Sequence, residues 1–148
     1  MKQETSEKVL VWLHGDNLDP HNPALEAYPG APVVFVFDEK VLENYQLSAK
    51  RLIFLYECLL EIPNIQICKG DVTEQLSLAA AQLDCSRLAT IESIAPRFNQ
   101  ICLRLRREKK LPVELFKITP FVELVLEVEE NLDLKRFSRY WQTVSQYL

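Results

Sequence analysis

A short apolar run, followed by a polar loop and a helix start, places the strongest constraint on the fold of this chain. The run Val9–Leu13 is too short for a helix and suits a fully buried strand. The loop from Asp16 to His21 is polar, and Asn22-Pro23 then supplies a helix cap and the residue favoured at the first helical position. A strand, a loop and a helix start form the first unit of a parallel α/β sheet. Ligands of such sheets usually bind just beyond the C-terminal ends of the strands.

Strand and helix patterns alternate along the rest of the chain. Further buried strands are predicted at 31–38, 65–68, 88–94 and 113–118, and helices from 22, over 47–62 and 71–83, and from 96. The helix over 47–62 is apolar on two sides, so we expect it to be covered on more than one face. The alternation predicts an α/β fold, a three-layer Rossmann-like sandwich whose five-stranded, mostly parallel sheet has helices on both faces.

The end of the chain is predicted to be helical. Thr119-Pro120 favours a helix start, although Leu124, Leu126 and Val128 would also fit a strand. Apolar residues then recur at intervals of three and four, which predicts an amphipathic C-terminal helix. We therefore expect a single domain over 1–148, with a disordered tail at 1–7 and a helical extension at 119–148.

The composition is typical of a single globular domain and gives no sign of a nucleic-acid-binding or membrane protein. The chain has 148 residues, 48% of them apolar, which suffices for one domain with one substantial core. Its net charge of −4 gives no general attraction to nucleic acid or to an anionic membrane. It shows neither a long apolar span nor a secretory signal, so a cytoplasmic protein is expected. The four cysteines are widely spaced, which favours reduced, mostly buried thiols over a zinc site.

Several short motifs, in the right order, resemble the N-terminal α/β domain of the DNA photolyase/cryptochrome family. That family opens with W-[FY]-R-R-D-L-R-x-x-D-N-P-A-L after its first strand, and Trp12, Asp16 and Asn22 to Leu25 match in register. The remaining matches are Phe37-Asp38, the R-x-x-F-L-x-E-x-L frame of Arg51, Phe54, Leu55, Glu57 and Leu59, Gly70-Asp71 with Glu74 and Leu76, and Thr119-Pro120-Phe121.

The resemblance also implies what this chain lacks. In the family, flavin binding, the tryptophan electron-transfer chain and lesion recognition belong to a larger C-terminal helical domain. The sequence ends at Leu148, so no FAD site and no photorepair are expected from it. Pro96-Arg97 stands where folate-binding members carry Asn-Glu. A deazaflavin-type antenna chromophore, near Asp38, Arg51 and Glu92, is therefore more compatible with the resemblance than a folate.

Polar residues at the expected strand ends are the candidate ligand-binding residues. One alternative is a divalent metal held by the histidines and aspartates of the first loop, but a loop that caps the following helix is favoured. No GxGxxG or GxxxxGK[ST] motif can be written with three glycines. A related nucleotide site, using His14, Gly15 and the start of the first helix, stays open. The candidate residues are His14, Asp16, Asn17, Asp38, Arg51 and Glu92, and the loop residues weighed for a metal are His14, Asp16, Asp19 and His21.

Neither the basic run near the end of the chain's fourth predicted helix nor the Ser, Cys and His residues indicate a functional site. The basic run at 104–110 is interpreted as a solvated helix end that complements the helix dipole, rather than as a phosphate site. No Ser/His/Asp or Cys/His arrangement indicates nucleophilic catalysis, so no catalytic residue is predicted.

The leading hypothesis is a non-catalytic, stand-alone photolyase-like domain that acts by protein association, as a homo-oligomer or with a partner. A small-ligand binder, for a nucleotide or an antenna chromophore, is the alternative, and an accessory to a separately encoded flavin photolyase is a third. Direct binding to DNA or to a membrane is not expected. The predicted interface consists of Leu134, Phe137, Trp141, Val144 and Leu148.

Overall fold

The computed structural model describes residues 7–118 and 135–147. The chain divides into two compact units, 1–118 and 119–148, each described here by itself. The predictions for Thr119-Pro120, for 124–128, and for Leu134 and Leu148 lie outside the described residues.

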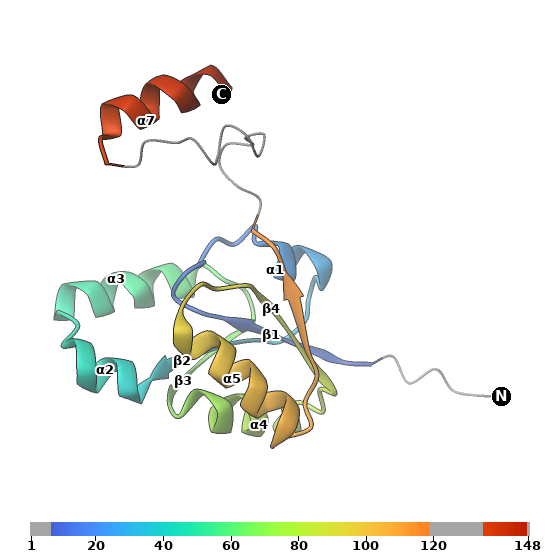
Figure 1. Cartoon of the computed structure of the whole chain (residues 1–148). Coiled ribbons are helices and arrows are strands. Elements are labelled where there is room, and N and C mark those ends of the chain that lie inside the picture. Colours follow the sequence, from blue (N-terminus) through green and yellow to red (C-terminus); the bar gives the residue numbers. More distant parts are fainter. Residues whose placement is uncertain (1–6, 119–134, 148) are drawn as a thin grey trace. The chain divides into compact units, whose positions relative to one another are not determined.

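The first unit is built on a five-stranded sheet in which every pair of neighbouring strands is parallel. Its strands are β1 (Val9–Leu13), β2 (Val33–Asp38), β3 (Ile65–Gly70), β4 (Arg87–Ile91) and β5 (Val113–Phe116). They lie in the order β3-β2-β1-β4-β5, with β1 at the centre (Figure 1). The predicted α/β fold is confirmed, and the strand order is that of a doubly wound sheet.

Helices cover both faces of this sheet. Between β1 and β3 the chain forms α1 (Pro23–Ala27), α2 (Glu39–Tyr45) and α3 (Ala49–Leu60). After β3 it forms α4 (Val72–Gln82) and α5 (Pro96–Arg107). The direction of winding reverses between β1 and β4, so the loops after these two strands diverge at the C-terminal edge of the sheet. That edge is where the sequence predicted its polar residues to meet.

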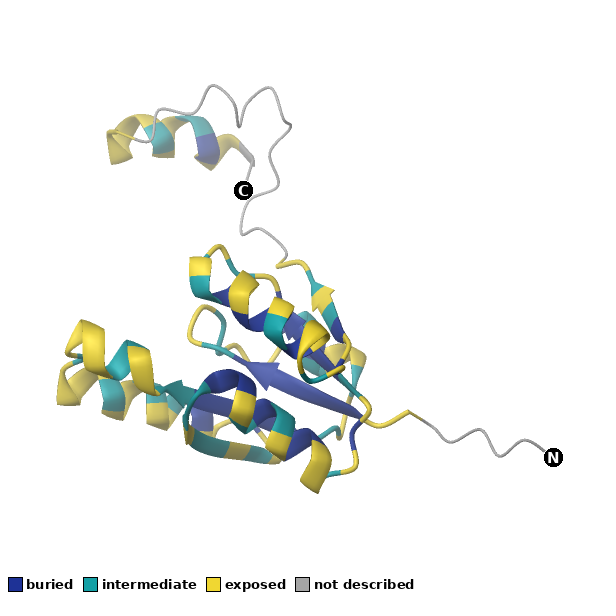
Figure 2. Ribbon diagram, turned by 60° about the horizontal axis from the view of Figure 1, so that its bottom comes forward, coloured by how far each residue is buried: buried dark blue, intermediate teal, exposed yellow. Residues whose placement is uncertain are grey.

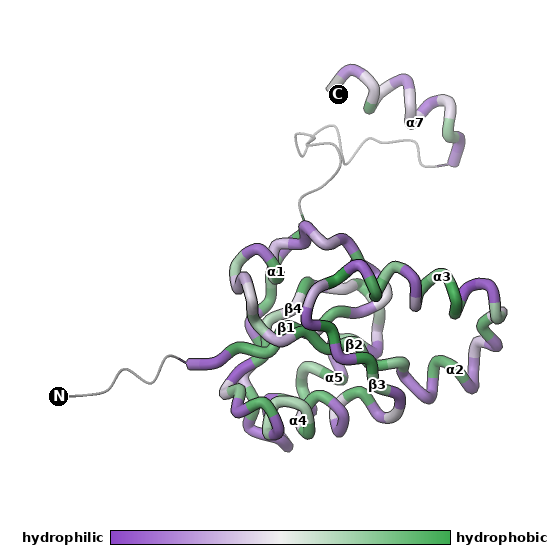
Figure 3. Tube along the Cα trace, turned by 180° about the vertical axis from the view of Figure 1, so that it is seen from behind, coloured by the Kyte–Doolittle hydropathy of each residue, from purple (hydrophilic) through white to green (hydrophobic). Residues whose placement is uncertain are grey.

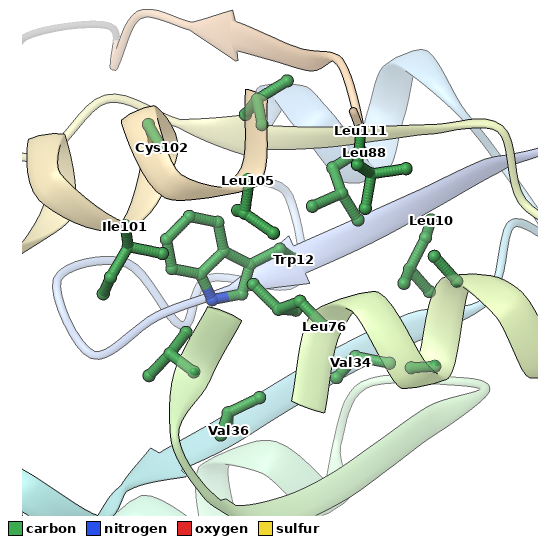
Figure 4. Close-up of a cluster of buried hydrophobic side chains, with 14 of the residues drawn as sticks. Leu10, Trp12, Val34, Val36, Leu76, Leu88, Ile101, Cys102, Leu105 and Leu111 are labelled. Atoms are coloured by element: carbon green, nitrogen blue, oxygen red, sulfur yellow. The ribbon is translucent and has the colours of Figure 1, made fainter. Parts of the chain in front are cut away.

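The core on the α4/α5 side is the larger of two apolar clusters (Figure 4). Trp12 lies at its centre with 3% of its surface exposed, and Leu76 and Leu105 are fully buried beside it. Helices α4 and α5 supply about half of this cluster, and the strands supply most of the remainder. The buried residues of the two helices are Val72, Thr73, Leu76, Ala79, Ala80, Phe98, Ile101, Cys102 and Leu105.

The helix predicted over 47–62 is present as α3, and the segment before it holds a helix that was not predicted. An additional helix, α2, begins directly after β2, with the Asp38 side chain accepting from the Lys40 N–H. It ends at Gln46, which has a left-handed φ of 41°, and Ser48 caps the start of α3. Within the described residues, α3 is covered along one side and not on several faces as the sequence suggested. Leu59 is its one buried residue, and Phe54 is 62% exposed (Figure 2).

The second unit contains α7 (Phe137–Val144) and a short 3₁₀ helix, Ser145–Tyr147. The predicted C-terminal helix is thus present over these residues. Phe137 and Trp141 stack with their ring centroids 6.0 Å apart, and they are 75% and 45% exposed, whereas Val144 is buried. Among the described residues, no helix combines the length and the hydrophobicity that a membrane crossing requires.

Candidate functional site

A cavity of about 370 Å³ lies at the C-terminal ends of β1 and β2. Its volume falls within the range of roughly 300–1,000 Å³ that is usual for small-molecule sites. The walls come from β1, β2, α2, α3, the first residue of α4 and the start of α5, so segments that are distant in sequence enclose it. The aromatic lining residues are Trp12, Phe35, Phe37, Tyr45 and Phe98, and the polar ones are His14, Asp16, Asp38, Arg51, Ser93 and Arg97.

Asp38 and Arg97 form the strongest polar contact of the cavity wall. The Arg97 guanidinium donates from Nε and from Nη2 to Asp38 Oδ2, at 2.9 and 2.6 Å. Asp38 ends β2 and caps α2, whereas Arg97 lies in the first turn of α5. The pair therefore joins elements from the two faces of the sheet across its C-terminal edge.

A second polar contact crosses the point where the winding reverses. The Ser93 hydroxyl, in the loop after β4, donates to the Asp16 carboxylate in the loop after β1, and Ser93 Oγ also accepts from the Ala95 N–H. Because the hydroxyl donates to a carboxylate, Asp16 holds Ser93 in place as a structural contact. The two loops that diverge from the centre of the sheet are thus tied together beside the cavity.

His14 connects the end of β1 to the end of β4 through hydrogen bonds. Its Nε2 donates to the Ile91 carbonyl at 2.8 Å, and its Nδ1 accepts from the Asp16 N–H at 3.4 Å. Its ring also packs edge-on against Phe98, with centroids 5.3 Å apart. Both ring nitrogens have backbone partners, so the residue supports the cavity wall and holds its ring at a fixed angle.

The loop after β1 caps the helix that follows, as the sequence predicted. Asn17 accepts from the Asp19 N–H at 3.0 Å, and Asp19 in turn accepts from the His21 N–H at 2.8 Å. Asn22 then accepts from the Leu25 N–H at 2.9 Å. No group of three metal-ligating side chains occurs within the residues that the structure describes. Of the four residues weighed for a metal, Asp19 and His21 form a turn of the loop, His14 is bonded to Ile91, and Asp16 accepts from Ser93.

Four of the six predicted ligand-binding residues do come together at the cavity: His14, Asp16, Asp38 and Arg51. The other two do not line it. Asn17 is used in the turn just described, and Glu92 is exposed, with its N–H bonded to the Phe116 carbonyl at 2.8 Å. Residues of α1 are also absent from the described lining, which leaves the nucleotide site at the start of that helix without support.

Sequence reasoning missed Arg97, Ser93 and the contribution of α2. In the sequence Arg97 stood out only as part of Pro96-Arg97, whereas in the structure it is half-buried in the pair with Asp38. A signal was present, because Pro96 marks the first turn of a helix that follows a parallel strand. Such a turn must start at the C-terminal edge of the sheet.

Arg51 differs from the other charged residues of the cavity. It lies on α3, lines the cavity and is exposed, and no side chain of the described residues forms an ion pair with it. Asp38 and Arg97 neutralise each other. Arg51 therefore supplies the positive charge that a bound anion could meet.

The basic end of α5 is tied to carboxylates on α4. Arg104 pairs with Asp71 at 3.1 Å, and Lys109 pairs with Glu74 at 2.7 Å. Burial raises the pKa of Asp71, but the Glu74 N–H and the Arg104 guanidinium outweigh it, so the pKa is lowered overall. This network lies outside the cavity lining and stabilises the packing of α4 against α5.

Comparison with known proteins supports the fold. No protein-family model and no curated protein matches this chain. Among the solved structures that match is a bacterial class III photolyase from Agrobacterium tumefaciens, with a TM-score of 0.51 and 16% sequence identity. The match covers 94% of this chain and 32% of the photolyase chain, so this chain spans about a third of that protein. At this identity the likeness shows a photolyase-like fold.

Proposed function

We propose that this chain is a photolyase-related domain that binds a small molecule with a flat aromatic ring and an anionic group. The observation that carries the proposal is the cavity at the C-terminal edge of the sheet, which combines an aromatic wall with the Arg51 guanidinium, to which no described carboxylate is paired. Its place, at the reversal of a doubly wound sheet, is where ligands of such folds bind.

The aromatic wall favours a planar ligand. Trp12 and Phe98 stack with centroids 5.3 Å apart and an interplanar angle of 18°, and Phe35 and Phe37 lie edge-on to each other on β2. A flat ring that enters between these side chains would gain offset or edge-on aromatic contacts. The cavity holds few polar groups, and most are already paired with each other, which suits a ligand with a largely apolar body.

The charges favour an anionic substituent on that ligand. With Asp38 paired to Arg97, the free charges of the lining are the Asp16 carboxylate, which accepts from Ser93, and the Arg51 guanidinium. A carboxylate or phosphate placed near Arg51 would form charge-assisted hydrogen bonds. Nucleotides and antenna-type chromophores both combine a flat ring with such a group. A chromophore bound here would supply absorption in the near ultraviolet or visible, while the protein would supply only its binding and orientation.

The experiment is a binding titration by calorimetry, preceded by an absorbance spectrum of the full chain purified from its native host. A band above about 350 nm that co-elutes with the protein supports a bound chromophore, since the aromatic side chains that bury such a ligand do not absorb there. Arg51→Ala should weaken binding of the ligand, or of a nucleotide used as a probe, by tenfold or more. Arg107→Ala, an exposed arginine outside the cavity lining, is the matched control. Equal affinities for the two variants would contradict the role of Arg51.

Protein association through α7 is the second candidate function. Phe137 and Trp141 stack on each other and stay 75% and 45% exposed, which is unusual for large aromatic side chains next to each other. The double variant Phe137→Ala with Trp141→Ala should reduce the average mass in a sedimentation experiment if this face carries an interface. A wild-type mass retained by the double variant would exclude α7 as the interface.

A further inference from the structure

Helix α3 carries an unpartnered apolar stripe that the cavity does not use. Its members are Ala49, Ile53, Tyr56 and Leu60, called here the outer stripe. They are all exposed, the three larger ones by 57%, 48% and 60% in chain order. Figure 3 colours much of α3 as hydrophobic, and Figure 2 shows most of it as exposed or intermediate. The opposite side holds the cavity residues Arg51 and Leu55.

The spacing of the outer stripe is that of a helix-pairing seam. Successive members are separated by four, three and four residues, so they form one straight row on the helix. A row of this kind buries its side chains when a second helix lies along it. Leu52 and Leu59 flank the row on the side that faces the helix's own domain, which leaves the other flank open.

We propose that the outer stripe pairs with the outer stripe of a second copy of this chain, with the two α3 helices antiparallel about a two-fold axis. In this register Ile53 of one copy lies against Tyr56 of the other, and the small Ala49 lies against Leu60. Each layer therefore joins a larger side chain with a smaller or flatter one. The arrangement is isologous and closes as a dimer.

The charges on the open flank support a second copy as the occupant. Lys50 and Glu57 are both exposed on this flank, two turns apart, and neither forms an ion pair within the described part of the chain. In the antiparallel register, Lys50 of each copy lies beside Glu57 of the other. A symmetric dimer thus gains two opposite-charge pairs of the kind that set orientation in coiled coils. A parallel pairing would instead place the Lys50–Glu57 flank of one copy beside the Leu52–Leu59 flank of the other, where no opposite charge is available.

The small area of the α3–α3 interface determines how tightly the dimer is expected to associate. Helix α3 has 12 residues and is about 18 Å long, so this pairing lies at the low end of specific interfaces, below about 1,200 Å². The dimer should accordingly be concentration-dependent. This inference does not rest on the proposed ligand, because the outer stripe and the cavity-lining residues lie on different sides of α3.

The test is sedimentation equilibrium of the full chain over a wide concentration range, with charge reversals that leave the apolar row intact. Lys50→Glu and Glu57→Lys should each weaken dimerisation at least threefold, because each places like charges together twice. The double variant Lys50→Glu with Glu57→Lys should restore the wild-type constant within about twofold, since opposite charges again face each other. Glu43→Lys, an exposed change of the same sign on α2, is the control and should have no effect.

A second readout locates the contact. A carbodiimide crosslink between mixed isotope-labelled copies should join Lys50 of one copy to Glu57 of the other, and mass spectrometry identifies the joined peptides. A chain that stays monomeric at the highest concentration overturns the proposal. A dimer whose dissociation constant is unchanged by the charge reversals also overturns the proposal. This includes a dimer that depends on Trp141 of α7 and not on α3.

Discussion

Asp38 accepts two hydrogen bonds from Arg97, at 2.9 and 2.6 Å, and through them the end of β2 is fixed to the first turn of α5. The two residues are 59 positions apart in the sequence and belong to the two halves of a doubly wound sheet. Because Asp38 also caps α2, one carboxylate contacts two of the helices that line the cavity.

Loss of this pair should destabilise the fold measurably. The Asp38 side chain is 13% exposed and that of Arg97 is 36% exposed, so Arg97→Ala should lower the free energy of unfolding by about 1–2 kcal/mol. Asp38→Asn keeps a good helix cap and should cost about the same, whereas Asp38→Ala also loses the cap and should cost about 1 kcal/mol more. Urea unfolding measures all three. Equal costs for Asp38→Asn and Asp38→Ala would show that the cap on α2 contributes nothing.

The attachment of α3 should depend on Leu59. Leu59 is fully buried and is the only buried residue of that helix, so Leu59→Ala should cost about 2–4 kcal/mol. Ile53→Ala, on the exposed outer stripe, should change the free energy of unfolding by less than about 0.5 kcal/mol at low protein concentration. Thermal unfolding of the two variants provides the comparison. Similar losses at both positions would mean that the outer stripe is covered in the monomer.

Asp71 should make stability depend on pH in the acid range. Its pKa is lower in the folded chain than its ordinary value of 3.8, with Arg104 and the Glu74 N–H as the stabilising partners. This contribution is present above the unfolded pKa and is lost as the pH falls through the folded one. Because both side chains of the pair are about a third exposed, it should amount to about 0.5–1 kcal/mol.

Asp71→Asn isolates that contribution, because asparagine still caps α4 but cannot form the ion pair. Denaturant unfolding between about pH 7 and pH 3 should show the wild type losing more stability on acidification than the variant, until the two curves converge. Parallel curves over the whole range would rule out a role for the Asp71 charge.

The four cysteines should fall into two reactivity classes. All are free, and burial raises the pKa of Cys85 and raises that of Cys102 to about 11. Cys58 and Cys68 are only half-buried. A thiol reagent at neutral pH should label these two rapidly and Cys85 and Cys102 only after unfolding, because the thiolate is the reacting species. Peptide mapping after a short exposure separates the classes, and rapid labelling of Cys102 would contradict its placement in the core.

Much of the fold could be predicted from local patterns. The run Val9–Leu13 is a buried strand with the predicted bounds, and Asn22 caps α1 as its residue type suggests. The stripes of α4 and α5 face the core because spacing at three and four residues places their apolar side chains on one side. These features depend on periodicity and capping, which a sequence displays directly.

The cavity could be predicted only in part. Parallel strands bring their C-terminal ends to one edge, which groups His14, Asp16 and Asp38, and the family resemblance added Arg51 of α3. The partner of Asp38 could not be predicted, because Arg97 is distant in sequence and carries no motif. Helix α2 was missed because its residues, EKVLENY, include only two aliphatic side chains, Val41 and Leu42, which is too few to display a helical period. Its signals were the Asp38 cap and the acidic first turn.

Helix α3 presents Arg51 and Leu55 to the cavity and the outer stripe to the opposite side, so the two proposed binding events would share one rigid element. Thermodynamic linkage then makes them reciprocal: any factor by which a ligand changes the dimerisation constant is the factor by which dimerisation changes the affinity for the ligand. Ligand affinity would accordingly vary with the concentration of the protein itself. At a fixed ligand concentration, the fraction of chains with an occupied cavity would then depend on the total concentration of the chain.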